Sequence, residues 1–388
     1  MVKFRKIIFW AHLTAGLLAG IVILVMSLTG VCLAFEPQII NWQERELREV
    51  APPGPDAKPL DVDALLAKVR NENPASSPTA VTLRSEPRAS VMATFGRDDV
   101  VYLNPYDGQI LGHGSKIRGV LLQIENVHRW LGASDDHRAA ARAVTGAGNA
   151  VFLMLAASGL YLWWPRSWSA SALRPAIWFA DGLRGKARDW NWHNTIGLWC
   201  APVLIVLTLS GVIMSYQWAN NLLYKMTGNE PPPPQAERSG GNQRREKNRH
   251  ADDDADHHHE AASFAGMIAK AAEQMPDWSI INLRLPQRAG APVTISIQNS
   301  GSPFAFYRSQ LTLNSSTGEV MKWEPFTGQN LGRKLRIWAR FLHTGEALGV
   351  AGQCVAAMAC AGGALLVWTG FAMAWRRFFG RKQPAAAK

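Results

Sequence analysis

Four long apolar stretches constrain this chain most, because each is long enough to cross a bilayer as a helix. They occupy residues 7–35, 144–164, 195–218 and 347–375, and the first contains no Asp, Glu, Lys or Arg. A helix needs about 20 predominantly apolar residues to span the hydrocarbon core. We therefore expect an α-helical membrane protein with four transmembrane helices. The first stretch is too long for a signal peptide and ends at Glu36-Pro37 without a small-residue cleavage site, so we expect a retained helix.

Basic residues in the short connections predict the orientation. The connection 165–192 contains five of them, and four more follow directly after the fourth stretch: Arg166, Arg174, Arg184, Lys186 and Arg188, then Arg376, Arg377, Arg381 and Lys382. Cytoplasmic loops carry an excess of Lys and Arg. We expect a multi-pass protein of the bacterial inner membrane with both termini in the cytoplasm. Arg333, Lys334, Arg336 and Arg340 stand against this, but long outer loops are largely exempt from the charge rule.

Composition fits this class and argues against others. Sixteen Trp and a formal charge of +11 are typical of a membrane protein with aromatic belts and basic cytoplasmic ends. No recognition helix or single-strand-binding signature accompanies the basic charge, so we expect no nucleic-acid partner. The four cysteines lie in or beside the apolar stretches and form no C-x-x-C pair: Cys32, Cys200, Cys354 and Cys360. They are predicted to be small buried side chains rather than disulfides or zinc ligands.

The two halves of the chain resemble each other. His12 and His193 are 181 residues apart, as are Gly30 and Gly211, which end the runs Ser-Leu-Thr-Gly and Thr-Leu-Ser-Gly. Near the ends of the second and fourth stretches, Ser158-Gly159 and Thr369-Gly370 are related by an offset of 211. This pattern predicts an internal duplication in which the first helix pairs with the third and the second with the fourth.

Each outer segment predicts a small α+β module. The first has a helix at 61–72 and strands at 80–84, 89–95 and 99–103; the second has a helix at 263–274 and strands at 279–285, 292–298 and 305–313. Residues 229–260, rich in Pro and charge, predict a flexible linker. The expected domains are helix 1 (1–36), the first module (37–127), helix 2 with its outer approach (128–164), a cytoplasmic loop (165–192), helix 3 (193–218), the second module (219–342) and helix 4 with a basic tail (343–388).

Four histidines at membrane edges are the candidate functional residues. His12 and His193 open the first and third helices, and His128 and His343 precede the second and fourth. A single interfacial histidine is more often a structural residue, but two per face, related by duplication, are what bis-imidazole ligation of haem between helices requires. His12 lies 18 residues before Gly30, about 27 Å along a helix, so it cannot share an iron with His128. The natural pairs are His12 with His193 and His128 with His343, which predicts two haems.

Other residues have weaker indications. Four outer arginines are candidates for haem propionates or for lipid headgroups: Arg118, Arg129, Arg336 and Arg340. His137 is an alternative outer ligand, and His113 is predicted to be solvated. The run His257-His258-His259 is a weak candidate for metal chelation. No nucleotide-binding or hydrolase motif is present, so we expect no flavin or nicotinamide domain of the chain's own.

Several motifs together resemble the PepSY-associated transmembrane protein family, which includes siderophore-iron reductases of the bacterial inner membrane. They are FWAHLTAGLLAG with SLTG, VHRWLG, SGLYLWWPR and NWHNTIGLW, with two helix-plus-strand modules that look like PepSY domains. The resemblance covers nearly the whole chain. It implies b-type haem, with His12, His193, His128 and His343 as ligands, and reductive release of iron from ferric siderophores in the periplasm. The segment FLHTGEALG around His343 lacks the Arg-Trp that follows His128. The two outer histidines are therefore not fully equivalent in sequence.

The preferred function is therefore a ferric-siderophore reductase, a membrane oxidoreductase with two b-type haems. Its electron donor, a quinol or a cytoplasmic reductase, is not identified by the sequence. The alternatives are a non-enzymatic protein whose outer modules bind a protein or peptide, and a permease for the iron chelate. Charged or helix-breaking residues near the midplane would favour transport, and only Pro202, near the start of the third helix, approaches this. Haem content distinguishes the first two hypotheses.

Overall fold

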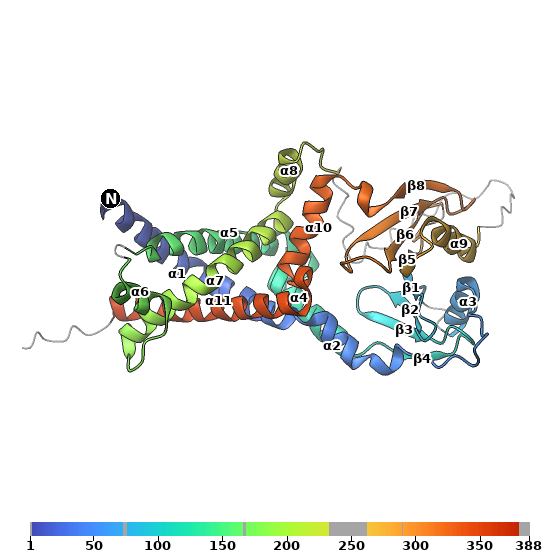
Figure 1. Ribbon diagram of the computed structural model, residues 1–388, viewed down its shortest axis with the longest axis horizontal. Coiled ribbons are helices and arrows are strands. Elements are labelled where there is room, and N and C mark those ends of the chain that lie inside the picture. The colour runs from blue at the N-terminus through green and yellow to red at the C-terminus, as the bar shows by residue number, and fades with distance from the viewer. Residues whose placement is uncertain (1, 73–75, 166–167, 233–261, 289, 380–388) are drawn as a thin grey trace, which may run out of the picture. The chain divides into compact units, whose positions relative to one another are not determined.

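The computed structural model describes residues 2–72, 76–165, 168–232, 262–288 and 290–379 (Figure 1). The chain forms two compact units. The helical unit contains Met1–Glu36, Gln123–Pro231 and Leu331–Lys388, and the sheet unit contains Pro37–Leu122 and Pro232–Asn330. Each unit is thus assembled from segments far apart in the sequence.

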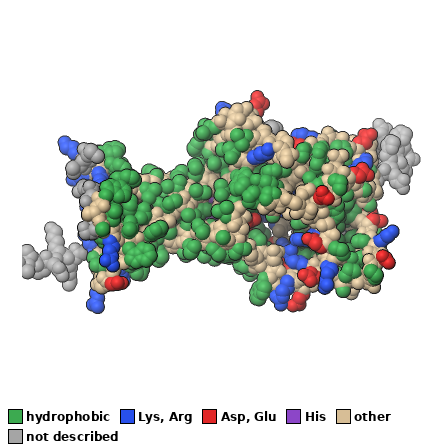
Figure 2. All heavy atoms as spheres, in the orientation of Figure 1, with side chains coloured by type: hydrophobic (Ala, Val, Ile, Leu, Met, Phe, Trp, Pro, Cys, Tyr) green, Lys and Arg blue, Asp and Glu red, His purple; other side chains and the backbone are tan. Residues whose placement is uncertain are grey.

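Four helices of the helical unit are long and apolar enough to cross a membrane, as the sequence predicts. They are α1 (Val2–Leu33), α5 (Arg138–Trp163), α7 (Gly185–Ser215) and α11 (Gly349–Phe378). Helices α1 and α7 each pack against both α5 and α11. Large apolar side chains such as Leu18 and Met358 face outward, and Figure 2 shows hydrophobic side chains over much of the visible surface of these helices. An apolar exterior of this extent is what a lipid environment requires.

Shorter helices accompany these four. They are α4 (Ile117–Trp130), α6 (Ala170–Ile177), α8 (Gln217–Met226) and α10 (Leu331–His343). None of these was predicted from the sequence, because each is short and none contains a long continuous apolar run. Two of them matter most here: α4 carries His128 and α10 ends at His343. The approaches to α5 and α11 are therefore helical, which places both histidines on regular backbone.

The sheet unit contains one antiparallel sheet of eight strands, with the order β4-β3-β2-β1-β5-β6-β7-β8. Its strands are β1 (Ala80–Arg84), β2 (Val91–Phe95), β3 (Asp99–Leu103), β4 (Ile110–His113), β5 (Trp278–Arg284), β6 (Val293–Asn299), β7 (Arg308–Leu313) and β8 (Val320–Glu324). Helix α2 (Glu36–Gln43) precedes it, and α3 (Val62–Glu72) and α9 (Phe264–Gln274) each lie just before four strands. Short 3-10 turns complete the described elements: Arg45–Leu47, Asp135–His137, Phe326–Gly328 and Glu346–Leu348.

The two outer segments share this sheet instead of forming separate modules. Strand β1 pairs with β5 in antiparallel register from Ala80 opposite Arg284 to Arg84 opposite Ile280. Each segment also has a fourth strand, β4 or β8, that the sequence analysis did not predict. Both are short and partly exposed, so they lack the alternation of buried and exposed residues that identifies the other strands.

One core holds the sheet and its two helices together. Alternate residues of β6, Val293, Ile295 and Ile297, are fully buried. They belong to a cluster that includes Leu65 of α3 and Met267 of α9. Burying each such side chain stabilises the fold by roughly 1.5–3 kcal/mol relative to leaving it exposed. Alternation with a period of two explains why these residues form strands with one face toward the core.

A buried ion pair fixes the start of the sheet unit. Glu44 is 1% exposed, and its carboxylate accepts hydrogen bonds of 2.6 Å from Arg118 Nε and 2.6 Å from Tyr102 Oη. The backbone N–H of Ser115 donates a third at 2.8 Å. Burial by itself raises the pKa of Glu44, but the hydrogen bonds from Arg118, Tyr102 and Ser115 outweigh it and bring the pKa to about 2.

Replacing Glu44 with glutamine is expected to destabilise the sheet unit by about 3 kcal/mol, because Arg118 keeps its charge and loses its carboxylate. Hydrogen exchange of the β3 amides in the full-length protein measures this loss. Glu46→Gln is the matched control, since Glu46 and its partner Arg45 are mostly exposed, and it should change little. Equal exchange rates in the two variants would contradict the prediction.

The same carboxylate predicts a pH dependence. Its folded pKa of about 2 lies below the ordinary value of 4.5, so the unfolded chain binds a proton first as the pH falls. The stabilisation from Glu44 is therefore complete above about pH 4.5 and is lost between that pH and about 2. Glu44→Gln should remove this component of acid destabilisation, and an unchanged acid profile in the exchange measurement would contradict it.

The cysteines and the predicted linker remain to be compared with the structure. The cysteines are free, as expected, but Cys32 and Cys354 are exposed rather than buried, because they lie on the outward surfaces of α1 and α11. The prediction of burial was wrong for these two. The predicted linker 229–260 lies outside the described residues from residue 233 onward.

Candidate functional site

The structure brings the four candidate histidines together as two pairs. The ring centroids of His12 in α1 and His193 in α7 are 6.4 Å apart, with their planes at 82°. The centroids of His128 in α4 and His343 in α10 are also 6.4 Å apart, with their planes at 61°. These are the two pairings that the sequence analysis expected from helix length.

The spacing within each pair fits two axial ligands of one metal ion. An imidazole nitrogen binds a metal at about 2.0–2.1 Å and lies about 1.1 Å from its ring centroid, so two rings on opposite sides of one ion have centroids about 6.3 Å apart. The observed separations agree with this value. Direct stacking or a hydrogen bond between the two rings of a pair would bring them closer.

A serine or threonine holds Nδ1 of each histidine. The hydroxyl oxygen is 2.8 Å from Nδ1 in the pairs His12–Ser158 and His128–Thr29, 2.9 Å in His193–Thr369 and 3.2 Å in His343–Ser210. Each of these hydroxyls directly precedes one of the glycines that mark the sequence repeat. Methyl groups placed on Gly159, Gly370 and Gly30 would lie 3.5, 3.7 and 3.8 Å from Cε1 of His12, His193 and His128. The repeated dipeptides thus line the histidine rings.

The hydroxyl contacts favour the tautomer that carries the proton on Nδ1. A hydroxyl has one proton, and here it is donated to a carbonyl one turn earlier in the same helix: Thr29 to Val25 at 2.7 Å, Ser210 to Val206 at 2.7 Å, Thr369 to Leu365 at 2.8 Å and Ser158 to Leu155 at 3.3 Å. In this arrangement the hydroxyl oxygen accepts from Nδ1–H of the histidine. Nε2 keeps its lone pair, as a metal ligand requires.

A cavity of about 710 Å³ adjoins the His12–His193 pair. Both rings line it, together with glycines on all four long helices, among them Gly16, Gly159, Gly197 and Gly370. A methyl group placed on Gly16 would approach nothing closer than Leu155 at 4.0 Å. Gly16 and Gly197 each follow a histidine by four residues, so they lie on the same helix face one turn away. The cavity volume lies within the range of cofactor pockets, about 300–1,000 Å³, and its apolar lining suits a macrocycle.

Basic side chains line the same cavity, and the sequence analysis did not assign them to a site. They are Arg5, Lys6, Lys186 and Arg377. Arg377 also lies over the ring of Trp10, 4.9 Å from its centroid, and Arg5 donates to the carbonyl of Leu162. These cations suit the two carboxylates of a haem. In the sequence, Lys186 and Arg377 were used only to predict orientation, because basic residues at a helix end already have that explanation.

The four predicted outer arginines have different surroundings. Arg118 is bound to Glu44 in the sheet unit, which already neutralises its charge. Arg336 donates to Asn220 Oδ1 at 3.1 Å, and Arg129 pairs with Glu125 at 2.8 Å. Arg340 lies 5.6 Å from the ring centroid of Phe341. Arg129 and Arg340, each at or next to the last turn of a histidine-bearing helix, remain the better candidates.

The remaining histidines are not part of these pairs. His137 and His113 are exposed, and His137 Nδ1 lies 3.2 Å from Ser134 Oγ. The run His257–His259 lies outside the described residues. Within the described ranges, no group of three or more His, Cys, Asp or Glu side chains is placed to hold a metal ion.

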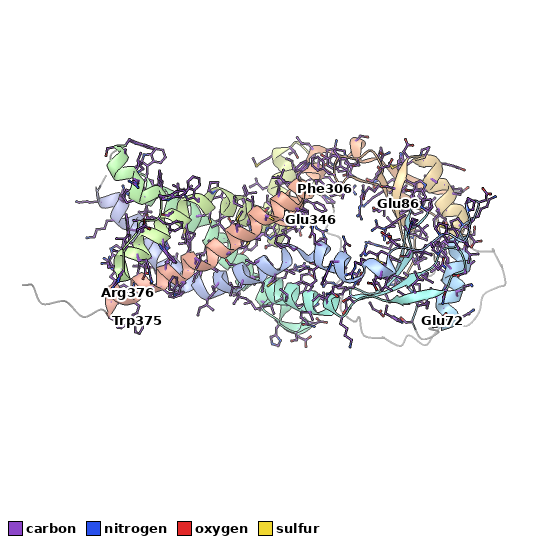
Figure 3. All side chains as sticks on the ribbon, turned by 60° about the horizontal axis from the view of Figure 1, so that its bottom comes forward. Glu72, Glu86, Phe306, Glu346, Trp375 and Arg376 are labelled. Atoms are coloured by element: carbon purple, nitrogen blue, oxygen red, sulfur yellow. The ribbon has the colours of Figure 1, made fainter. Side chains whose placement is uncertain are left out.

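An unexpected ion pair joins α7 to α11 at the same end of the helical unit as the basic cavity residues. Asp189 is fully buried and accepts from both Arg188 and Arg376, the latter labelled in Figure 3. Asn191, also buried, donates to the carbonyl of Pro175 at 2.7 Å. These contacts anchor the first turns of α7, from which His193 projects. Buried polar groups of this kind are retained only when they are paired.

The family model described as the PepSY-associated TM region matches residues 9–377. No curated protein matches the chain. The matched region includes all four histidines and both units.

Proposed function

The chain belongs to the family of proteins with a PepSY-associated transmembrane region, and on this premise we propose that it is a haem-containing oxidoreductase of the bacterial inner membrane. It would pass electrons across the membrane to reduce the iron of ferric siderophores in the periplasm. The single observation that carries the proposal is the geometry of the two histidine pairs, each at 6.4 Å, with Nδ1 of all four rings held by a hydroxyl.

The proposal includes the finer features of the fold. The chain would be an internal duplication, in which α3 with β1–β4 and α9 with β5–β8 are two PepSY-like halves of the sheet unit. The termini and the loop between α5 and α7 would lie in the cytoplasm, with the sheet unit in the periplasm. The His12–His193 pair would then be the inner site and the His128–His343 pair the outer one. The basic residues at the cavity agree with this orientation.

A b-type haem bound at each histidine pair would supply one-electron transfer. The chain's own residues do the rest. His12, His193, His128 and His343 present unprotonated Nε2 atoms, and the glycines at the inner cavity leave space between the helices. Arg5, Lys186 and Arg377 line the inner cavity and would neutralise propionates there, as Arg129 and Arg340 would at the outer site. Apolar packing around Phe152, Leu204 and Leu207 excludes water from the interior of the helical unit.

The substrate and the electron donor are part of the same proposal. Oxygen ligands of a siderophore hold Fe(II) less tightly than Fe(III), so transfer of one electron to the bound ferric ion releases it. A quinol or a cytoplasmic reductase would supply that electron at the inner site. The alternatives are a binding protein that uses the sheet unit to hold a protein or peptide, and an iron-chelate permease. Neither alternative requires four histidines with free Nε2 atoms.

The decisive experiment is a reduced-minus-oxidised absorption spectrum of the detergent-purified protein, with haem quantified per chain. We expect sharp b-type bands and two haems per chain. Reoxidation of the reduced protein by ferric siderophores, with gallium siderophores as a redox-inert control, then tests the substrate class. Absence of haem after expression with ample haem supply would overturn the proposal and favour the binding-protein alternative.

A further inference from the structure

We propose that Ser158 is a positioning residue that tunes the potential of the inner haem through its hydrogen bond to His12. This inference rests on the proposed function, since it concerns ligands of bound haem. It concerns the side chains behind the ligands, which neither sequence reasoning nor family membership assigns to any role.

The direction of the hydroxyl–histidine hydrogen bonds affects the basicity of the ligands. Each hydroxyl donates to its own helix and accepts from a histidine Nδ1–H, as described above. An acceptor at Nδ1 makes Nε2 more basic and fixes the rotation of the ring. A more basic axial ligand stabilises Fe(III) relative to Fe(II), so it lowers the reduction potential of the haem.

The histidines differ in the number of acceptors near Nδ1. His343 Nδ1 has a second acceptor, the Leu207 carbonyl, at 2.8 Å, which is closer than Ser210 Oγ at 3.2 Å. The Leu207 carbonyl lies three residues before Ser210 in α7. Loss of the Ser210 hydroxyl therefore leaves this backbone acceptor in place.

His12 differs from His343 in this respect. Across the described part of the chain, Ser158 Oγ is the one acceptor found for His12 Nδ1, at 2.8 Å. The carbonyl three residues earlier, Leu155, receives the serine hydroxyl at 3.3 Å instead. Removing the Ser158 hydroxyl therefore removes the whole hydrogen bond that orients His12 and increases its basicity. The potential of the inner haem should depend on this single oxygen atom.

The matched experiment compares Ser158→Ala with Ser210→Ala, the same substitution behind an inner and an outer ligand. Redox titration of the full-length protein in detergent, followed by haem absorbance, measures both midpoint potentials. Low-temperature EPR of the oxidised protein reports ring orientation. Ser158→Ala should move one midpoint to a more positive potential and change one EPR signal. Ser210→Ala should leave both potentials close to those of the original protein.

Ser158→Thr is the rescue variant, because threonine performs the same function at residues 29 and 369. It should restore the original potential. If Ser158→Ala loses one haem while Ser158→Thr retains it, the positioning role is supported. The inference is overturned if Ser158→Ala keeps two haems with unchanged potentials and EPR, if Ser210→Ala has an equal effect, or if Ser158→Thr fails to rescue. A wild-type protein without haem would instead overturn the proposed function itself.

Discussion

Replacing His12 with alanine is expected to reduce the haem content from two per chain to one and to abolish electron transfer to the ferric substrate. The same result is expected for His193→Ala, because both rings serve one site. Removing either ligand leaves a five-coordinate or empty site, while the second pair is unaffected. His343→Ala and His128→Ala should each remove the other haem. Haem quantification and the reduced-minus-oxidised spectrum of each purified variant measure these losses.

His137→Ala is the control for these variants, since its ring is exposed and bonded to Ser134. It should retain two haems and full activity. The double variant of His12 and His193 should lose no more haem than either single variant, because the two act on one site. Full haem content in all four single variants would contradict the ligand assignment. Loss of both haems in His12→Ala alone would indicate that this variant misfolds.

Replacing Gly16 with leucine is expected to exclude the inner haem while the helices still pack. A methyl group at Gly16 has 4.0 Å to its nearest neighbour, so the larger side chain has room to extend into the cavity. It would occupy the space between His12 and His193 that the macrocycle needs. Gly197→Leu should act in the same way from α7, although Leu366 is nearer there, at 3.6 Å. The measurement is haem per chain together with the monodispersity of the purified protein.

Ala11→Leu is the matched control on α1, because Ala11 is exposed on the outer surface. It should keep two haems. Gly20 gives a useful contrast: its Cβ would lie 2.6 Å from the Phe371 ring, so a larger side chain there should separate α1 from α11 and destabilise the fold. A Gly16→Leu protein that binds two haems would show that the cavity is not the site.

Much of the fold was predictable because its strongest signals are local. Apolar runs of 21 to 29 residues identified the four long helices, whose bounds the structure extends at their polar ends, as at Arg138 and Gly185. Strands with alternating burial, such as β6, were predicted within one residue. The joining of β1 to β5 was not predicted, because nothing within either strand specifies a partner nearly two hundred residues away. Helices α4 and α10 were missed because they are amphipathic, so their apolar residues are spaced along the sequence and form no continuous run.

The candidate site was predictable in its histidines and not in their surroundings. The repeat spacing and helix length led to the pairs that the structure brings together. The Ser-Gly and Thr-Gly dipeptides were visible in the sequence, but only as markers of the repeat. Their contact with Nδ1 depends on how α1, α5, α7 and α11 pack, which no sequence spacing specifies. The basic cavity residues were missed for the same reason, and Arg118 was misjudged because Glu44 is 74 residues away.

The β1–β5 pairing has a consequence for biogenesis. Hydrogen-bonded strands must lie on one side of the bilayer, so the chain between them must cross it an even number of times. A mis-inserted chain in which only one of α5 and α7 crosses is unable to complete the sheet. During synthesis, β5 follows β1 by roughly 190 residues, or about 10–40 s of translation. Throughout that delay the β1 edge is open to wrong partners. The sheet can therefore form only after the helical hairpin between its two halves has been inserted correctly.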